Sequence, residues 1–217
     1  MPSLSDFTSS SARPLPVILL TDVSGSMAPD GKIDALNRAV REMIDTFRGE
    51  DDLRAEIHLG VIAFGDTARE HLALCPAKKV TWTDMAARGG TPLGAAFDLA
   101  AALVEDRQKV SSRSYRPTLV LLSDGQPTDS WQASLDRLNR SERAAKADRM
   151  ALAIGADADA EVLKAFVAAK GRVFRADEAR QIHTFLRFVT MSVTGRSRSA
   201  APNDAVATPS IDLDAIE

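Results

Sequence analysis

The apolar run Pro16-Val17-Ile18-Leu19-Leu20-Thr21 leads directly into Asp22-Val23-Ser24-Gly25-Ser26, and the fold is organised around this junction. The run is short and follows Pro14, which is typical of a buried strand rather than a helix. Oxygen-bearing side chains then alternate, and Gly25 lets the backbone turn tightly between the serines. One carboxylate and two hydroxyls suit a hard cation such as Mg²⁺. They equally suit a turn that caps the next helix, and this motif alone leaves both interpretations open.

Composition places the chain among ordinary soluble globular proteins. Its 217 residues are 45% hydrophobic and 26% charged, which allows one domain with a full core. A net charge of −3 and a pI of about 5.7 give no sign of nucleic-acid binding. The single cysteine, Cys75, excludes an internal disulfide and fits a reducing compartment. The Ser-rich start has no apolar core, so we expect no signal peptide; no apolar run approaches the ~20 residues of a membrane span, and we expect a cytoplasmic protein.

Apolar periodicity predicts strands that alternate with helices. The predicted strands cover residues 16–21, 56–64, 118–122, 149–154 and 172–175. The predicted helices cover residues 32–47, 92–105, 131–146, 160–169 and 178–193. Gly65-Asp66-Thr67 indicates a hairpin turn that returns residues 69–74 as an antiparallel strand, and residues 78–83 form a weaker extended piece.

This order predicts the α/β fold class. Uniformly apolar strands between helices are typical of a doubly wound, mostly parallel sheet with helices on both faces, here with one antiparallel edge strand. We expect one domain over residues 14–194. A polar, Ser-rich lead at residues 1–13 and a tail at 195–217 are expected to be disordered.

Two of the predicted strands end in an acidic residue. Residues 16–21 lead to Asp22, and residues 118–122 lead to Asp124 within Ser123-Asp124-Gly125. Ligands of such sheets bind at the carboxyl ends of the strands, where the strand order reverses. If the two strands are neighbours, both carboxylates face one crevice. Thr91, in a glycine-led loop, would add a further oxygen.

Each of these residues also has a simpler structural role. Thr91 would cap the helix that Pro92 begins, and Asp124 would form a turn with Gly125. Asp129 would cap the helix predicted from Trp131. For each residue taken alone, the structural role is the better interpretation. The convergence of two strand-end acids, two spaced serines and the Thr91 turn on one end of the sheet favours a metal site.

The chain resembles von Willebrand factor A domains. Asp22-Val-Ser24-Gly-Ser26 matches the D-x-S-x-S of that family, Thr91 in Gly89-Gly90-Thr91-Pro92-Leu93 matches its distant threonine, and Asp124 matches its distant aspartate. The resemblance covers about residues 15–193. It implies a metal-ion-dependent adhesion site (MIDAS) formed by Asp22, Ser24, Ser26, Thr91 and Asp124. The stretch Asp124 to Asp129 and the compact size resemble TerY-type proteins of bacterial tellurium-resistance and stress operons, and the expected lack of a signal peptide points away from secreted adhesion proteins.

The resemblance implies an intracellular protein-interaction module. Its cofactor would be Mg²⁺, with Mn²⁺ or Ca²⁺ as alternatives, and a protein partner would supply a Glu or Asp to the metal. The candidate partners include an operon-encoded kinase, phosphatase or other stress protein. We expect Ser24, Ser26 and Thr91 to be direct ligands, and Asp22 and Asp124 to act partly through waters. Surrounding loops would contact the partner through Asp66, Gln126, Thr128 and Asp129.

A Mg²⁺-dependent phosphohydrolase is the alternative function. A strand-end Asp beside magnesium forms the phospho-enzyme of some phosphatases. The haloacid-dehalogenase pattern needs a second Asp two positions later, where this chain has Ser24, and the sequence contains no P-loop motif. We therefore expect a protein that binds rather than an enzyme.

Overall fold

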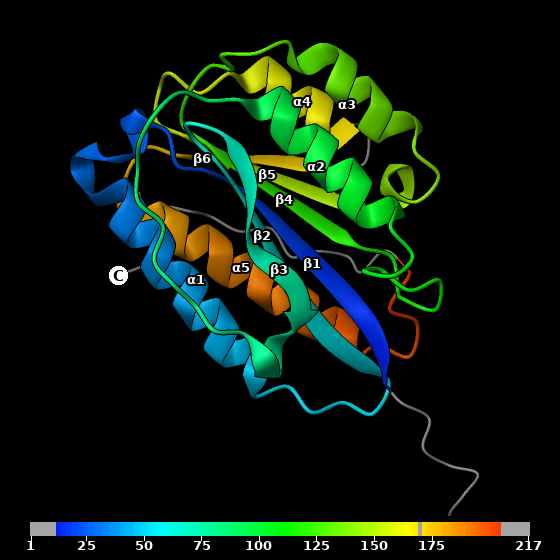
Figure 1. The fold of residues 1–217 in the computed structure, drawn as a ribbon. Helices are drawn as coiled ribbons and strands as arrows, with labels where there is room; N and C mark the ends of the chain where they lie inside the picture. The colour runs from blue at the N-terminus through cyan, green and yellow to red at the C-terminus, as the bar shows by residue number, and fades with distance from the viewer. Residues whose placement is uncertain (1–11, 169–170, 205–217) are drawn as a thin grey trace, which may run out of the picture.

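The computed structural model describes residues 12–168 and 171–204. These residues form a six-stranded sheet in the order β3-β2-β1-β4-β5-β6 (Figure 1). The strands are β1 (Arg13–Asp22), β2 (Ala55–Phe64), β3 (Ala68–Pro76), β4 (Thr118–Ser123), β5 (Asp148–Ile154) and β6 (Arg172–Ala176). Every neighbouring pair is parallel except β2 and β3, which form the antiparallel hairpin at one edge. The predicted doubly wound α/β fold is confirmed.

Helices cover both faces of the sheet (Figure 1). α1 (Lys32–Arg48) and α5 (Ala179–Arg198) pack on one face, and α2 (Leu93–Glu105), α3 (Trp131–Arg140) and α4 (Ala160–Val167) pack on the other. Short 3-10 turns lie at Gly25–Met27, Pro29–Gly31, Ala77–Lys79 and Ala144–Lys146.

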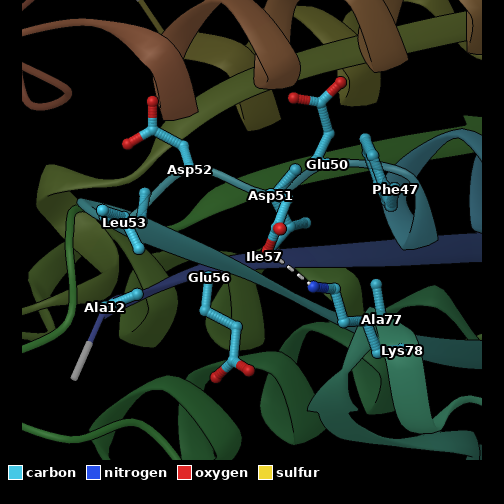
Figure 2. Close-up of a pocket in the computed structure, with 11 residues that line it drawn as sticks. Ala12, Phe47, Glu50, Asp51, Asp52, Leu53, Glu56, Ile57, Ala77 and Lys78 are labelled. Atoms are coloured by element: carbon cyan, nitrogen blue, oxygen red, sulfur yellow. Dashed lines mark hydrogen bonds and ion pairs between the residues drawn. The ribbon is translucent and has the colours of Figure 1, made fainter.

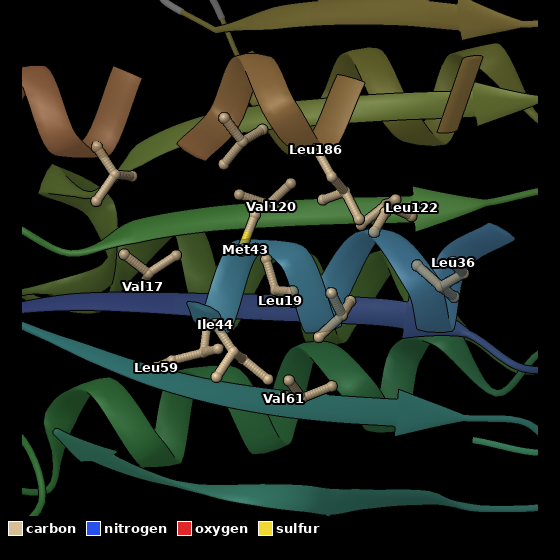
Figure 3. Packing of buried hydrophobic residues seen from close by; sticks show 14 of the residues in the cluster. Val17, Leu19, Leu36, Met43, Ile44, Leu59, Val61, Val120, Leu122 and Leu186 are labelled. Carbon is tan, nitrogen blue, oxygen red and sulfur yellow. The ribbon is translucent and has the colours of Figure 1, made fainter. Parts of the chain in front are cut away.

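Side chains of β1 alternate between the two resulting cores. Leu19 packs with Met43 of α1 and Leu186 of α5 on one face (Figure 3), whereas Ile18 and Leu20 pack in the other core. All three β1 residues are fully buried. Burial on both faces explains why the strands are apolar at every position instead of at alternate ones.

The helix predicted over residues 131–146 and the extended piece predicted over residues 78–83 differ from the structure. The helix predicted to reach residue 146 ends at Arg140, because the Glu105 carboxylate accepts hydrogen bonds from the backbone N–H groups of Arg143 (2.7 Å) and Ala144 (3.3 Å) and holds them beside α2. The extended piece predicted over residues 78–83 begins as the 3-10 turn Ala77–Lys79, and no strand is assigned there.

The disordered tail predicted from residue 195 is wrong for residues 195–204. α5 continues to Arg198, and Arg196 turns inward to contact Thr118, Asp148 and Pro202. The remainder of that tail and residues 1–11 of the predicted lead lie outside the described residues. None of the described helices has the length and apolar character needed to cross a membrane.

Candidate functional site

The two strand-end carboxylates lie on neighbouring strands. Thr21 of β1 pairs with Leu122 of β4, so Asp22 at the end of β1 and Asp124 just after β4 lie together at the carboxyl ends of the two strands. The strand order reverses at this point, because β2 lies on one side of β1 and β4 lies on the other. Asp22 is 0% exposed and Asp124 is 3% exposed. The structure therefore brings together the two acids that the sequence singled out.

A chain of hydrogen bonds connects the acids with the two serines. Ser26 Oγ donates to Asp124 Oδ1 at 2.7 Å and lies 2.9 Å from Ser24 Oγ. Since Ser26 has one hydroxyl proton and gives it to Asp124, Ser24 must donate to Ser26. Asp22 accepts from the backbone N–H of Ser24 at 2.8 Å and from Ser123 Oγ at 2.7 Å. Sequence reasoning did not assign Ser123 this role.

Burial makes the charged form of Asp22 costly. Burial raises the pKa of Asp22 from 3.8 to about 6, and the nearby charge of Asp124 adds to the increase. The hydrogen bonds from Ser24 and Ser123 act in the opposite direction and lower the pKa. Two carboxylates that share a buried crevice favour a cation between them.

Thr91 reaches this crevice on a loop fastened to the Asp22 turn. Gly25 N donates to Gly89 O at 2.9 Å, and Arg88 N donates to Val23 O at 2.7 Å. Gly89 has a φ of +77°, and a Cβ at this position would overlap Asp66, so this close approach requires glycine. A Cβ added to Gly125 would lie 3.3 Å from Thr91 Oγ1 and 3.7 Å from Ser26 Oγ. Both hydroxyls therefore border the Gly125 turn that follows Asp124.

Two of the residues predicted to contact a partner hold the site loops in place. Thr128 Oγ1 accepts from Thr91 N at 3.0 Å, and Asp129 accepts from Gly94 N at 2.8 Å and Ala95 N at 3.0 Å. Asp129 thus caps α2, and not the α3 helix that the sequence suggested. Asp66 and Gln126 are exposed, and Asp66 pairs with Arg88. Partner contact remains a prediction for all four residues.

Lys32 is a site residue that sequence reasoning missed. It is the first residue of α1, and its Nζ donates to Asp124 Oδ2 at 2.8 Å and to Ser26 O at 3.2 Å. The available signal was a lysine six residues after the last serine of the motif, at the predicted helix start. That spacing alone does not show that the side chain turns back toward the β4 loop.

A second hollow lies at the opposite end of the sheet, beside the starts of β1 and β2 (Figure 2). Leu53 is exposed there, and four acidic residues line the hollow. Each acid has a basic partner: Glu50 with Arg198, Asp51 with Lys78, Asp52 with Arg54, and Glu56 with His58. These pairs are structural, so we assign the hollow no function.

The donor set at the Asp22 edge fits a hard divalent cation. Its side chains are two carboxylates and three hydroxyls, and oxygen is the donor atom that Mg²⁺ and Ca²⁺ prefer. Within residues 12–168 and 171–204, no three His, Cys, Asp or Glu side chains group as metal ligands, so an ion held at this site would depend on hydroxyl oxygens as well as carboxylates. Asp22, Ser24, Ser26, Thr91 and Asp124 are the residues that would hold the ion.

Comparisons with known proteins show which families and proteins the chain is similar to. The family model of the von Willebrand factor type A domain matches residues 17–187. An uncharacterized protein of Mycobacterium tuberculosis is 31% identical over 133 residues, which are 59% of this chain and 20% of the relative. This chain therefore spans about a fifth of that protein.

Three solved structures share the fold. A von Willebrand factor type A protein from Catenulispora acidiphila has a TM-score of 0.66 at 20% identity, covering 85% of this chain and 43% of that one. VWA2, an ArnB paralog from Sulfolobus acidocaldarius, has a TM-score of 0.61 at 18% identity, covering 82% and 46%. Proximal thread matrix protein 1 of the mussel byssus, solved with a zinc-occupied MIDAS motif, has a TM-score of 0.61 at 14% identity, covering 83% and 48%. This chain spans less than half of each.

Proposed function

Because the chain belongs to the von Willebrand factor type A domain family, we propose that it is a protein-interaction module that binds an acidic partner through a divalent cation. The observation that carries the proposal is the hydrogen-bonded arrangement of Asp22, Ser24, Ser26 and Asp124 at one buried sheet edge. The site is built by loops whose backbones bond to one another, which favours a prepared binding position.

We propose Ser24, Ser26 and Thr91 as direct ligands, with Asp22 and Asp124 acting partly through waters. Two carboxylates balance the charge of a divalent ion and hydroxyls add none, so an ion held here would accept a further oxygen from a partner carboxylate. Mg²⁺ is the proposed ion, with Mn²⁺ or Ca²⁺ as alternatives. The mussel protein, which holds zinc in its own MIDAS motif, supports including Zn²⁺ in the tests.

Metal binding is tested by isothermal titration calorimetry of the full chain with each ion. Ser26→Ala removes one proposed ligand from an exposed turn, and we expect it to weaken Mg²⁺ binding roughly tenfold or more. Ser130→Ala, which alters an exposed serine on the adjacent loop, is the matched control and should bind as the native protein does. Unchanged affinity in Ser26→Ala, or no binding by the native protein, would contradict the proposed site.

The partner is tested by affinity capture from a native lysate with Mg²⁺ and again with a chelator. We expect proteins retained only with Mg²⁺ to be lost with Ser26→Ala and kept with Ser130→Ala. Retention that does not depend on the metal would place the binding surface elsewhere.

We further propose that the module binds without catalysing a reaction. The three histidines make other contacts: His58 with Glu56, His71 with the Thr83 carbonyl, and His183 with Glu42. A phosphate-release assay with generic phosphoesters tests the alternative. Mg²⁺-dependent turnover that Asp22→Ala abolishes would establish a phosphohydrolase instead.

Three finer assignments remain predictions from the sequence: the similarity to TerY-type proteins, the cytoplasmic location, and an operon-encoded kinase, phosphatase or stress protein as partner. Mass spectrometry of the captured proteins tests the last of them directly.

A further inference from the structure

The Lys32 ammonium enters the candidate metal site from outside the five-residue motif. Its Nζ lies 2.8 Å from Asp124 Oδ2 and 3.2 Å from the Ser26 carbonyl oxygen. The Asp124 side chain is 0% exposed and that of Lys32 is 20% exposed. The pair of Lys109 and Glu70 is more exposed, with 45% of the Lys109 side chain and 29% of the Glu70 side chain accessible to solvent. Lys32 is thus a cation held against a buried proposed ligand.

Lys32 changes the net formal charge of the site. Asp22 and Asp124, when ionised, contribute −2, and Lys32 brings the sum to −1. A divalent cation then raises the sum to +1, whereas the same site without Lys32 would reach 0. The lysine therefore opposes the metal, because like charges repel at short range, and favours an anion once the metal is bound.

The ammonium also lies beside the end of β5. A Cβ added to Gly155, at the end of β5, would have one neighbour within 4 Å, the Lys32 Nζ at 4.0 Å. Because a lysine side chain has a flexible four-carbon stem, an ion bound at Asp124 would displace the ammonium toward Gly155, at the edge of the crevice. From there its charge would still act on an incoming carboxylate.

We propose that Lys32 couples the cation to the partner: it competes with the divalent ion for Asp124 and, with the ion bound, supplies the positive charge that selects an acidic ligand. This proposal rests on the proposed metal-dependent function. It makes Lys32 a residue that sets ligand specificity, in addition to the five proposed ligand residues.

The test measures Mn²⁺ affinity of the full chain by electron paramagnetic resonance, in chloride and in acetate of equal ionic strength. Lys32→Met keeps the length of the side chain and removes the charge. We expect this variant to bind Mn²⁺ about fivefold more tightly than the native protein in chloride. Acetate should strengthen Mn²⁺ binding to the native protein and strengthen it less in Lys32→Met.

Two further variants separate the charge from its surroundings. Lys32→Arg keeps the charge and should retain the acetate effect of the native protein. Lys109→Met removes a lysine that pairs with Glu70 and with none of the proposed ligand residues, and it should leave both affinities unchanged. Circular dichroism of each variant confirms that it is folded.

The outcomes distinguish a failure of the role proposed for Lys32 from a failure of the proposed metal-dependent function. If the native protein binds Mn²⁺ and Lys32→Met binds it equally or more weakly in chloride, the role of Lys32 is overturned and the metal site stands. The same holds if acetate acts equally on both proteins. If the native protein binds no Mn²⁺, the proposed function fails, and the coupling fails with it.

Discussion

Asp22 combines full burial with a carboxylate neighbour, and both raise its pKa, to about 6. A folded-state pKa above 3.8 means that this group stabilises the fold fully below about pH 4 and that the stabilisation is lost as the pH rises through about 6. The difference between the two values corresponds to about 3 kcal/mol. Without a cation, ionised Asp22 therefore costs the fold most at neutral and alkaline pH.

Asp22→Asn should relieve this cost. In a chelator, we expect the substitution to raise the free energy of unfolding by about 1–3 kcal/mol more at pH 8 than at pH 4, because Asn cannot ionise. Urea denaturation at the two pH values measures the effect. Asp136→Asn, at an exposed position on α3, is the control and should change little at either pH. Equal effects of Asp22→Asn at both pH values would contradict the pKa assignment.

At the scale of elements, Asp129 links the loop after β4 to the start of α2. Its carboxylate accepts hydrogen bonds from two N–H groups in the first turn of α2 that lack partners within the helix. Removing such a cap generally costs about 1 kcal/mol. The same contact fixes the loop that carries Thr128, which in turn bonds to the backbone of Thr91.

Asp129→Ala should therefore lower the free energy of unfolding by about 1 kcal/mol, measured by urea denaturation. Asp136→Ala removes an acid whose contact, to Arg140 at 3.8 Å, is long, and it should cost less than about 0.5 kcal/mol. If both substitutions have the same small effect, the cap on α2 is not an important contribution to stability.

At the scale of the whole molecule, Arg196 joins the end of α5 to the ends of β4 and β5 that lie away from the metal site. It donates to Thr118 Oγ1 at 2.6 Å and to the carbonyls of Arg116 and Pro202 at 3.0 Å, and it pairs with Asp148 at 2.9 Å. Its side chain is 7% exposed. Deleting the Arg196 guanidinium removes the donor to Thr118 Oγ1 and to these two carbonyl oxygens, and the loss of hydrogen bonds to buried polar groups is costly.

Arg196→Met should lower the free energy of unfolding by about 2–3 kcal/mol. Arg198→Met breaks the pair with Glu50 at a side chain that is 67% exposed and should cost less than about 1 kcal/mol. Urea denaturation compares the two variants.

A truncation after residue 194 should match or exceed the cost of Arg196→Met. A truncated protein as stable as the native one would restore the predicted domain boundary.

The amino-acid sequence was sufficient to predict the fold class, the order of the strands and helices along the chain, and five candidate ligand residues. These depend on local patterns: strands buried on both faces must be apolar throughout, and an Asp or Ser at a strand end follows directly from its position in the chain. The neighbouring placement of Asp22 and Asp124 needed one assumption, that β1 and β4 are adjacent, and the structure confirms it.

The roles of Lys32, Asp129 and Arg196 depend on the folded structure and could not be predicted from the sequence. Each has an ordinary local context, and each gains its role from a partner at least 35 residues away in the chain: Asp124, the start of α2, and the start of β4. Side-chain direction and long-range approach depend on how the packed layers meet, and no local periodicity records this. For the same reason, the sequence placed the end of the domain before Arg196.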